Sequence, residues 1–490
     1  MSDLYQIVIG LEVHVQLDTR TKLFCGCGTQ FGAPPNTQVC PVCLGLPGSL
    51  PVMNARAFEL GLRTAVALNC SIAPFTKWDR KNYFYPDLPK GYQISQFDLP
   101  FSADGVLKIS DTKDRFEPRT VGIIRAHLEE DAGKSLHDEV AGKADSRIDL
   151  NRTGTPLLEI VTLPDMRSPL EAKTFLTELK LLLTYLAVSD CNMQEGSLRV
   201  DANVNLHIDL PDGHVAKTPI VEIKNMNSFR AVERAIAYEA GRQFEVWQET
   251  GQVLGDAPKQ TRGWDDEAGV TRGQRYKEES SDYRYFPDPD LVPVCVTKEK
   301  VSQVREELGE LPADLRARLE ETFEITPYDS DVLVNQGRAL VGYYIELAEQ
   351  SGDGKAASNW MQNDVLRVMN ERQLAIQQFP LPAAQLAELI RRVKAGDLDR
   401  SRAAAVFNEM VASGKSVDEV MQAQGITRVD ESELVALCRE LIAANPKIVA
   451  DIKGGKLQAA SNLIGQAKKR NPNVSPARVK ELVLELVAKE

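Results

Sequence analysis

The sequence predicts an α+β fold, in which a largely antiparallel sheet comes first and helices follow. Apolar and polar residues alternate through residues 7–17 and 198–208, and this period of two is typical of strands with one buried face. Beyond Thr297 the pattern changes to helices almost without strands, with breaks rich in Gly and Pro. We therefore expect three domains, at 1–293, 294–400 and 401–490.

Composition excludes several classes of protein. A hydrophobic content of 43% is ordinary for a globular chain, and no apolar run is long enough to span a bilayer. The start, Met-Ser-Asp-Leu-Tyr, has no basic segment of the kind that opens a secretion signal, so the cytoplasm is the simplest compartment. The net charge of −12 argues against nonspecific coating of nucleic acid, although local charge can differ.

The polar residues of the expected strands are unusual for a solvated face. In a strand at 123–131, His127, Glu129 and Asp131 share one face, while Leu128 and Glu130 share the other. The same alternation exposes further acids, amides and cations on neighbouring strands: Glu12, His14, Glu159, Arg199, Asp201, Asn203 and Lys224. Each strand alone fits a solvated antiparallel sheet. Together they favour one shared cavity, whose carboxylates and histidines suit Mg²⁺ or Mn²⁺.

A phosphate-binding loop is excluded nearby. Gly133-Lys134-Ser135 matches the end of a P-loop, but the glycine that such a loop needs five positions earlier is replaced by Leu128. Lys134 remains a candidate phosphate partner.

Four cysteines lie in two closely spaced pairs, Cys25 with Cys27 and Cys40 with Cys43. This spacing predicts a closed tetrahedral zinc site with a structural role, because four thiolates leave no open position for chemistry. The alternative is a degenerate site of unliganded thiols.

Three helices and two irregular segments are also predicted. Asn54, Ser168 and Ser228 are N-cap residues before helices that reach about Leu68, Ala187 and Thr250. Residues 80–92 interleave basic and aromatic side chains, which can stack on a nucleotide or form a packed aromatic loop. Residues 251–294 lack a regular pattern and resemble an active-site loop.

The last segment carries a local positive charge. Residues 452–480 contain no acid and seven cations: Lys453, Lys456, Lys468, Lys469, Arg470, Arg478 and Lys480. Such a run predicts contact with phosphates, and its alternative is a solvated helical surface.

Seven motifs in one order closely resemble the B subunit of the tRNA-dependent amidotransferases. They are Gly-Leu-Glu-Val-His-Val-Gln-Leu at 10–17, the two cysteine pairs, residues 80–93, His-Leu-Glu-Glu-Asp-Ala-Gly-Lys at 127–134, Met-Gln-Glu-Gly-Ser-Leu-Arg at 193–199, Glu-Ile-Lys-Asn at 222–225 and Asp-Tyr-Arg-Tyr-Phe-Pro at 282–287. The resemblance runs along essentially the whole chain. It implies a cradle-shaped catalytic domain, a helical domain and a YqeY-like tail that binds tRNA.

The resemblance also implies an activity. Members of this family use ATP and Mg²⁺ to phosphorylate the side-chain carboxylate of misacylated Glu-tRNA(Gln) or Asp-tRNA(Asn), and ammonia from an amidase (A) subunit then displaces the phosphate. A small C subunit completes a heterotrimer.

Carried onto this sequence, the resemblance assigns Mg²⁺ to Glu12, His14, Glu129 and Glu159. Neutralisation of phosphate is assigned to Lys134, Arg199 and Lys224. We expect nucleotide binding from Arg80, Lys81, Tyr83, Asn151, Arg152, Ser197, Asp201 and Asn203. Two other readings stay open, a zinc-containing RNA-binding scaffold and an ATP-dependent kinase or ligase acting on a small free carboxylate.

Overall fold

The computed structural model describes residues 4–137, 146–274, 283–427, 430–454, 457–471 and 473–489. Asp282 and Lys456, both singled out in the sequence, lie outside the described residues. The chain divides into two compact units, one ending at Pro312 and the other beginning at Ala313. The first unit extends beyond the expected boundary at 294 because Val304 and Leu308, in and just after helix α5 (Lys298–Glu307), pack in its core.

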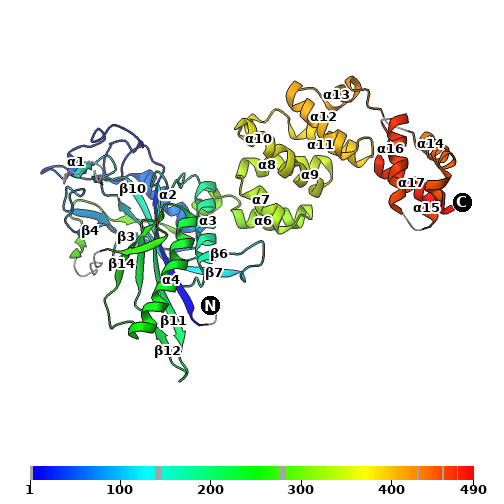
Figure 1. Cartoon of the computed structure of the whole chain (residues 1–490). Helices are drawn as coiled ribbons and strands as arrows, with labels where there is room; N and C mark the ends of the chain where they lie inside the picture. The colour runs from blue at the N-terminus through cyan, green and yellow to red at the C-terminus, as the bar shows by residue number, and fades with distance from the viewer. Residues whose placement is uncertain are drawn as a thin grey trace. The chain divides into compact units, whose positions relative to one another are not determined.

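A ten-stranded sheet forms the centre of the first unit (Figure 1). Its strands are β1 (Gln6–Gln16), β2 (Ser71–Ile72), β6 (Ser102–Ile109), β7 (Arg119–Glu130), β10 (Pro156–Thr162), β11 (Leu198–Asp209), β12 (Val215–Lys217), β13 (Val221–Lys224), β14 (Gln260–Asp265) and β15 (Val270–Gly273). Their order is β15-β14-β13-β11-β1-β10-β7-β6-β2, with β12 paired to β11. Among the described strands of this sheet, only the β13–β14 pairing is parallel, which confirms the predicted fold class.

Strands β14 and β15 lie within the segment expected to be irregular, so that expectation is wrong for residues 260–273. Trp264 is buried in the core, but the buried residues Thr261 and Thr271 are polar, so the apolar alternation of a strand is weak. Thr261 donates to Glu222 at 3.1 Å, and Thr271 donates to Glu239 on the neighbouring helix at 2.7 Å. Hydrogen bonds to buried acids therefore replace apolar contacts at these positions.

Helices α2 (Ala55–Ala67), α3 (Pro169–Tyr185) and α4 (Phe229–Thr250) cover one face of the sheet (Figure 1). Each begins where the sequence predicts, and the side chains of Asn54, Ser168 and Ser228 accept hydrogen bonds from the first turns. Alternate residues of the central strands, such as Val13 and Leu158, are buried against these helices. The polar residues between them consequently face the other side.

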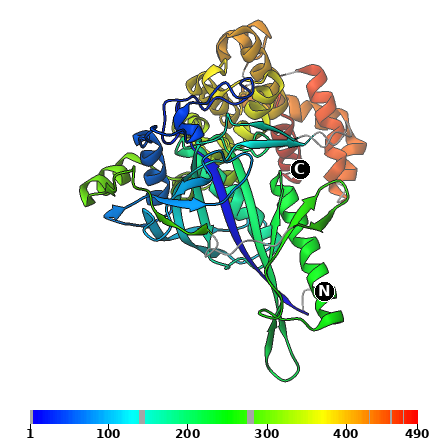
Figure 2. The same cartoon turned by 90° about the vertical axis from the view of Figure 1, so that its left-hand side faces the viewer.

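A three-stranded sheet lies on that other side. Antiparallel pairing joins β4 (Asp79–Asn82) to both β5 (Tyr92–Ser95) and β16 (Phe286–Pro287). The basic-aromatic segment at 80–92 is thereby joined to the aromatic residues at 283–287. Two short pairs, β3 (Phe75–Thr76) with β17 (Val294–Cys295) and β8 (Lys134–His137) with β9 (Ser146–Asp149), complete the unit. In Figure 2 the long β11–β12 hairpin extends alongside α4.

The second unit is helical throughout its described residues. Its helices are α6 (Pro312–Phe323), α7 (Pro327–Val334), α8 (Arg338–Ser351), α9 (Gly354–Trp360), α10 (Leu366–Arg372), α11 (Ala383–Lys394), α12 (Arg400–Ser413), α13 (Val417–Ala423), α14 (Glu431–Ala444), α15 (Pro446–Lys453), α16 (Ala460–Arg470) and α17 (Pro476–Lys489). One of the predicted glycine-rich breaks lies after Ser351, where Gly352 ends α8 in a left-handed conformation.

The packing of the second unit changes later than residue 400. Phe407 on α12 contacts Trp360 and Phe379, so α12 continues the packing of the preceding helices. A separate apolar core begins with Leu434 and reaches Val487. No helix in the described parts of the chain is long and apolar enough to cross a membrane.

Candidate active site

Register brings polar side chains of adjacent strands to one place. Glu159 on β10 lies opposite His14 on β1, and on the other side of β1 Asp201 and Arg199 of β11 lie opposite Glu12 and His14. Residues opposite each other in antiparallel strands point to the same face. The face away from the helices therefore carries all five side chains, as the alternation predicts.

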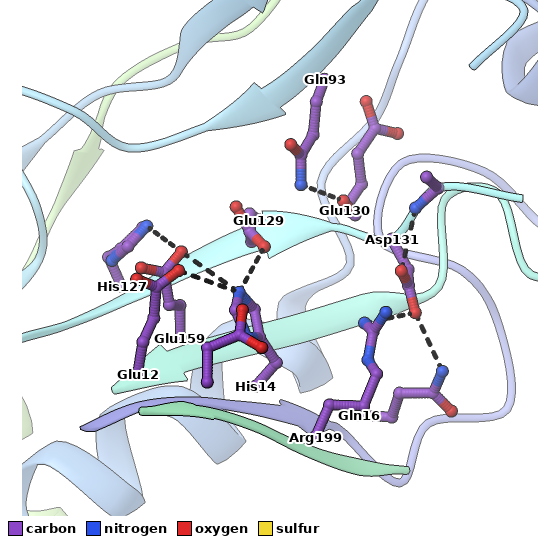
Figure 3. A network of polar contacts seen from close by, with 12 residues as sticks. Glu12, His14, Gln16, Gln93, His127, Glu129, Glu130, Asp131, Glu159 and Arg199 are labelled. Carbon is purple, nitrogen blue, oxygen red and sulfur yellow. Dashed lines mark hydrogen bonds and ion pairs between the residues drawn. The ribbon is translucent and has the colours of Figure 1, made fainter. Parts of the chain in front are cut away.

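Three carboxylates surround the imidazole of His14 (Figure 3). Its Nε2 lies 3.7 Å from Glu12 Oε1 and 3.7 Å from Glu129 Oε1. Glu159 Oε2 is 3.6 Å from the same nitrogen and 3.4 Å from His127 Nε2. The sequence-predicted set Glu12, His14, Glu129 and Glu159 is thus one cluster in the structure.

The carboxylates of the cluster repel one another unless positive charge lies between them. Burial alone would lower the pKa of His14, but the surrounding carboxylates, Glu159 most of all, raise it to about 9. Burial, reinforced by the charge of Glu159, raises the pKa of Glu129 to about 7. Burial opposes ionisation of Glu159, yet His127 and His14 outweigh it and lower its pKa. A cation beside His14 would neutralise these acids.

The donor atoms are close enough to hold a metal ion. Two sets of ligand atoms that share His14 each lie within 4.8 Å of one another: Glu12, His14 and Asp201, and His14, Glu129 and Glu159. Carboxylate oxygens are the ligands that Mg²⁺ prefers, so the residues present fit a divalent cation of this kind. Because a histidine must be neutral to bind a metal, such a cation would displace the proton of His14.

Glu12, His14 and Glu129 of the cluster line a cavity of about 420 Å³, which is also lined by basic side chains. Arg199, Lys224 and Lys81 line it together with Tyr83, Gln93, Asp201, Asn225 and Met226. The ammonium of Lys81 lies 4.8 Å from the centre of the Tyr283 ring. Burial opposes its charge, but Glu129 and other nearby groups raise the pKa of Lys81. The cavity therefore combines acids that suit a metal with cations that suit phosphate.

Asp131 fixes the position of Arg199. Its Oδ2 accepts from Gln16 Nε2 at 3.0 Å and pairs with Arg199 at 2.9 Å. Arg199 outweighs the effect of burial and lowers the pKa of Asp131. The sequence places Asp131 on the polar face with His127 and Glu129 but does not predict its pairing with Arg199, and it assigns no role to Gln16. The alternation in their strands was the available signal.

Several residues expected to bind nucleotide have other partners. Arg80 pairs with Asp288 at 2.7 Å and with Asp290 at 2.8 Å, which holds the segment after β16. Ser197 accepts from the backbone of Asn192 at 2.7 Å in the loop before β11. The side-chain oxygen of Asn203 is buried without a hydrogen-bond partner among the described residues.

Lys134, Asn151 and Arg152 line a second cavity, of about 380 Å³. The guanidinium of Arg152 donates to the carbonyl oxygens of Ala132, at 2.9 Å, and Gly133. Lys134 does not line the cavity beside the His14 cluster. Local sequence could not show this, because β7 ends at Glu130 and Lys134 begins a different strand pair.

The four paired cysteines come together at helix α1 (Pro41–Leu44). Cys43 Sγ lies 3.4, 3.6 and 3.7 Å from the sulfurs of Cys25, Cys40 and Cys27. Bonds of about 2.3 Å from a tetrahedral zinc ion would place sulfurs about 3.8 Å apart. The cluster could hold a metal such as zinc.

The cysteine-bearing loop is docked on the segment before β10. Asn151 accepts from the Gln38 backbone at 2.8 Å and donates to the Pro34 carbonyl at 2.7 Å. Asn36 donates to the Ile148 carbonyl at 3.0 Å. The side-chain amide of Asn151 thus anchors the cysteine-bearing loop. This structural role explains why an asparagine stands at this position without any contact to nucleotide.

Comparison with known proteins identifies the family. A family model described as the GatB/GatE catalytic domain matches residues 7–302, and one described as the GatB domain matches residues 342–487. The B subunit of the aspartyl/glutamyl-tRNA(Asn/Gln) amidotransferase from Rhodopirellula baltica is 61% identical over 98% of this chain and 97% of its own length. The chain belongs to the family of tRNA amidotransferase B subunits.

Other members of the B-subunit family match along the whole chain. Proteins with the same name from Moorella thermoacetica and Carboxydothermus hydrogenoformans are 47% and 44% identical, over 98% and 99% of this chain and 99% of each relative. These matches confirm the resemblance found in the motifs. The first matched range contains the sheet, the cavity and the cysteine cluster, and the second spans α8 to α17.

Proposed function

We propose that this chain activates and amidates the side-chain carboxylate of misacylated Glu-tRNA(Gln), Asp-tRNA(Asn) or both. The observation that carries the proposal is the cluster of Glu12, His14, Glu129 and Glu159, of which the first three line a cavity together with Lys81, Arg199 and Lys224. Ammonia cannot displace an oxygen directly from a carboxylate. Transfer of a phosphoryl group from ATP to one carboxylate oxygen makes phosphate the leaving group that ammonia then displaces. In-line phosphoryl transfer needs positioning and charge neutralisation more than covalent help.

In this proposal the cavity residues have separate roles. Glu12, His14, Glu129 and Glu159 hold Mg²⁺, which when bound neutralises the charge that develops on the transferred phosphoryl group. Arg199 and Lys224 neutralise phosphate oxygens, and Asp131 keeps Arg199 oriented toward the cavity. Lys81 and Tyr83, on the hairpin opposite the sheet, contact the nucleotide or the acceptor end of the tRNA and exclude water.

The partners and the cysteine site belong to the same proposal. We infer a complex with an amidase (A) subunit that supplies ammonia and with a small C subunit, located in the cytoplasm. Cys25, Cys27, Cys40 and Cys43 hold structural zinc, because their spacing fits a closed tetrahedral shell. All eight cysteines are free of disulfides, as in other proteins of reducing compartments.

The test is to incubate the purified complex with each misacylated tRNA, ATP and glutamine. The amino acid released from the tRNA is then identified, and ADP is quantified. Amide product formed with ATP consumption is expected. ATP consumption with free glutamate or aspartate in place of charged tRNA would contradict the proposal, as would tRNA binding without ATP turnover.

A further inference from the structure

Lys22 is a fully buried lysine beside the cysteine cluster. Its side chain is among the largest that the fold encloses completely, with 0% of the residue exposed. Its Nζ donates to the Gln38 carbonyl at 2.6 Å and lies 3.5 Å from Cys43 Sγ. The backbone N–H of Lys22 donates to the Cys27 carbonyl at 3.0 Å, so the residue is fixed to the loop at both ends.

The charge of the buried Lys22 ammonium needs an opposite charge nearby. A buried ammonium is costly unless an opposite charge accompanies it. Among the residues that the structure describes, no carboxylate forms an ion pair with Lys22. The Gln38 carbonyl supplies a dipole but no charge, and the remaining contact is the sulfur of Cys43. That sulfur is also the one closest to the other three cysteines.

We propose that Lys22 is the counter-ion of the cysteine cluster, with its ammonium donating to a Cys43 thiolate and offsetting the charge of a metal-bound Cys₄ centre. The inference rests on the zinc proposed above. Four thiolates around a divalent cation carry a net double negative charge, and burying that charge is unfavourable. One ammonium inside the fold compensates half of it. The same ammonium would repel a metal if the cysteines stayed neutral, so the pair favours a thiolate site over a degenerate one.

The hydrogen bonds of Lys22 also connect the cysteine cluster to the segment before β10. Gln38 accepts from Lys22 through its carbonyl and donates through its N–H to Asn151, on the segment that leads into β10. Hydrogen bonds to metal ligands orient them and raise affinity, and their loss typically costs about 10–100-fold in metal binding. Lys22 is therefore a positioning residue for the cluster and takes no part in the reaction of the carboxylate.

The test measures zinc affinity of the full chain by competition with a chromogenic chelator. Lys22→Met keeps the length of the side chain and removes the charge, Lys22→Arg keeps the charge, and Lys108→Met is the matched control on an exposed part of β6. We expect Lys22→Met to lose about 10–100-fold in affinity. Lys22→Arg should recover most of this loss, and Lys108→Met should bind like the wild type.

A second readout separates charge compensation from a general loosening of the loop. Iodoacetamide is added to the zinc-loaded proteins, and the alkylated cysteines are identified by mass spectrometry. We expect faster modification at Cys43 in Lys22→Met, because the sulfur loses its ammonium donor, with the other three ligands little changed. Wild-type zinc affinity in Lys22→Met, an equal loss in Lys22→Arg, or uniform alkylation of all four cysteines would each overturn the inference. Wild-type chain that binds no zinc would instead overturn the zinc proposal on which it rests.

Discussion

His14 shows how a few neighbouring residues can prepare a site for a cation. An oxygen of each of the three carboxylates lies within 3.7 Å of the His14 Nε2, and all four side chains are largely buried. In that arrangement the acids repel one another, and the raised pKa of His14 reflects their need for positive charge. The donor atoms are close enough together to hold a divalent cation in this place.

We predict that Glu129→Gln and Glu159→Gln each lower the rate of carboxylate phosphorylation by at least about 100-fold. Each change removes one negative ligand where charge develops in the transition state, whereas tRNA affinity comes from cations elsewhere. Rates are measured as ADP formed with misacylated tRNA, and affinity is measured by filter binding. Glu117→Gln, at an exposed acid of the same unit, is the control. Affinity that fell in parallel with the rate would indicate a structural role for the cluster.

At the scale of the element, the alternation of polar residues predicts which side chains share a face of the sheet, because the face of a strand depends only on parity. Helix starts are also predictable from local sequence, because the side chains of Asn54 and Ser168 cap the helices that they precede. Strands β14 and β15 could not be predicted because polar Thr261 and Thr271 occupy buried positions and leave Trp264 without an apolar alternation around it. The place of Lys134 could not be predicted either, because it begins a different strand pair from β7.

A buried ion pair holds the β4–β5 hairpin, whose residues Lys81 and Gln93 line the cavity, against the end of β7. Lys90 and Glu130 pair with 4% and 2% of their side chains exposed, and Glu130 also accepts from the Ile94 backbone at 2.8 Å. Gln93 donates to the Glu130 carbonyl at 2.7 Å. These contacts join β5 to the end of β7, next to Glu129. The hairpin thereby holds Lys81 over the acids.

We predict that Lys90→Met destabilises the protein by about 3–5 kcal/mol, because it leaves the carboxylate of Glu130 buried and unpaired. Lys90→Met combined with Glu130→Gln should recover most of that loss, since glutamine is uncharged and still accepts from Ile94. Urea denaturation measures both. Glu59→Gln, which breaks the exposed pair with Arg56, is the control, with an expected change below about 0.5 kcal/mol. A double variant no more stable than Lys90→Met would refute the ion-pair explanation.

At the scale of the whole molecule, the basic segment at 452–480 has less free charge than its sequence suggests. Arg470 pairs with Glu440 at 3.0 Å, and Arg478 pairs with Glu481 at 2.9 Å. Lys453, Lys469 and Lys480 are exposed and form no ion pair among the described residues. These three lysines are therefore better placed to meet phosphates than the arginines.

We predict that replacing Lys453, Lys469 and Lys480 together by alanine weakens tRNA binding and flattens its dependence on salt. For every phosphate that the variant no longer binds, the slope of log affinity against log salt falls by about 0.7–0.9, because fewer counterions are released on binding. Filter binding over a salt series measures the slope. Arg470→Ala with Arg478→Ala is the comparison, and its effect should be smaller. An unchanged slope in the lysine variant would exclude this surface from tRNA contact.

The last prediction concerns ammonia, which the chain consumes in the proposed reaction. Releasing it from glutamine requires an activated nucleophile, such as a cysteine thiolate beside a base. Burial raises the pKa of Cys70 and of Cys191 to about 11, so both remain thiols at neutral pH. Cys438 is buried in the core of the last segment, and Cys25, Cys27, Cys40 and Cys43 lie together in a cluster that could hold a metal. Among the described residues no hydrogen bond joins a cysteine to a histidine.

We therefore expect the isolated chain to form amidated tRNA from misacylated tRNA and ATP with a high concentration of ammonium salt, and to form none with glutamine. Restoring the amidase partner should restore the use of glutamine, because ammonia then reaches the cavity along a path where water cannot protonate it. Product is measured by releasing the amino acid from the tRNA and separating the acid from the amide. Glutamate release is followed in parallel to detect any hydrolysis of glutamine. Glu129→Gln, assayed with ammonium, controls for contaminating amidotransferase, since it should form no product. Glutamine-supported product from the pure chain would place ammonia release within this chain and contradict the division between the two subunits.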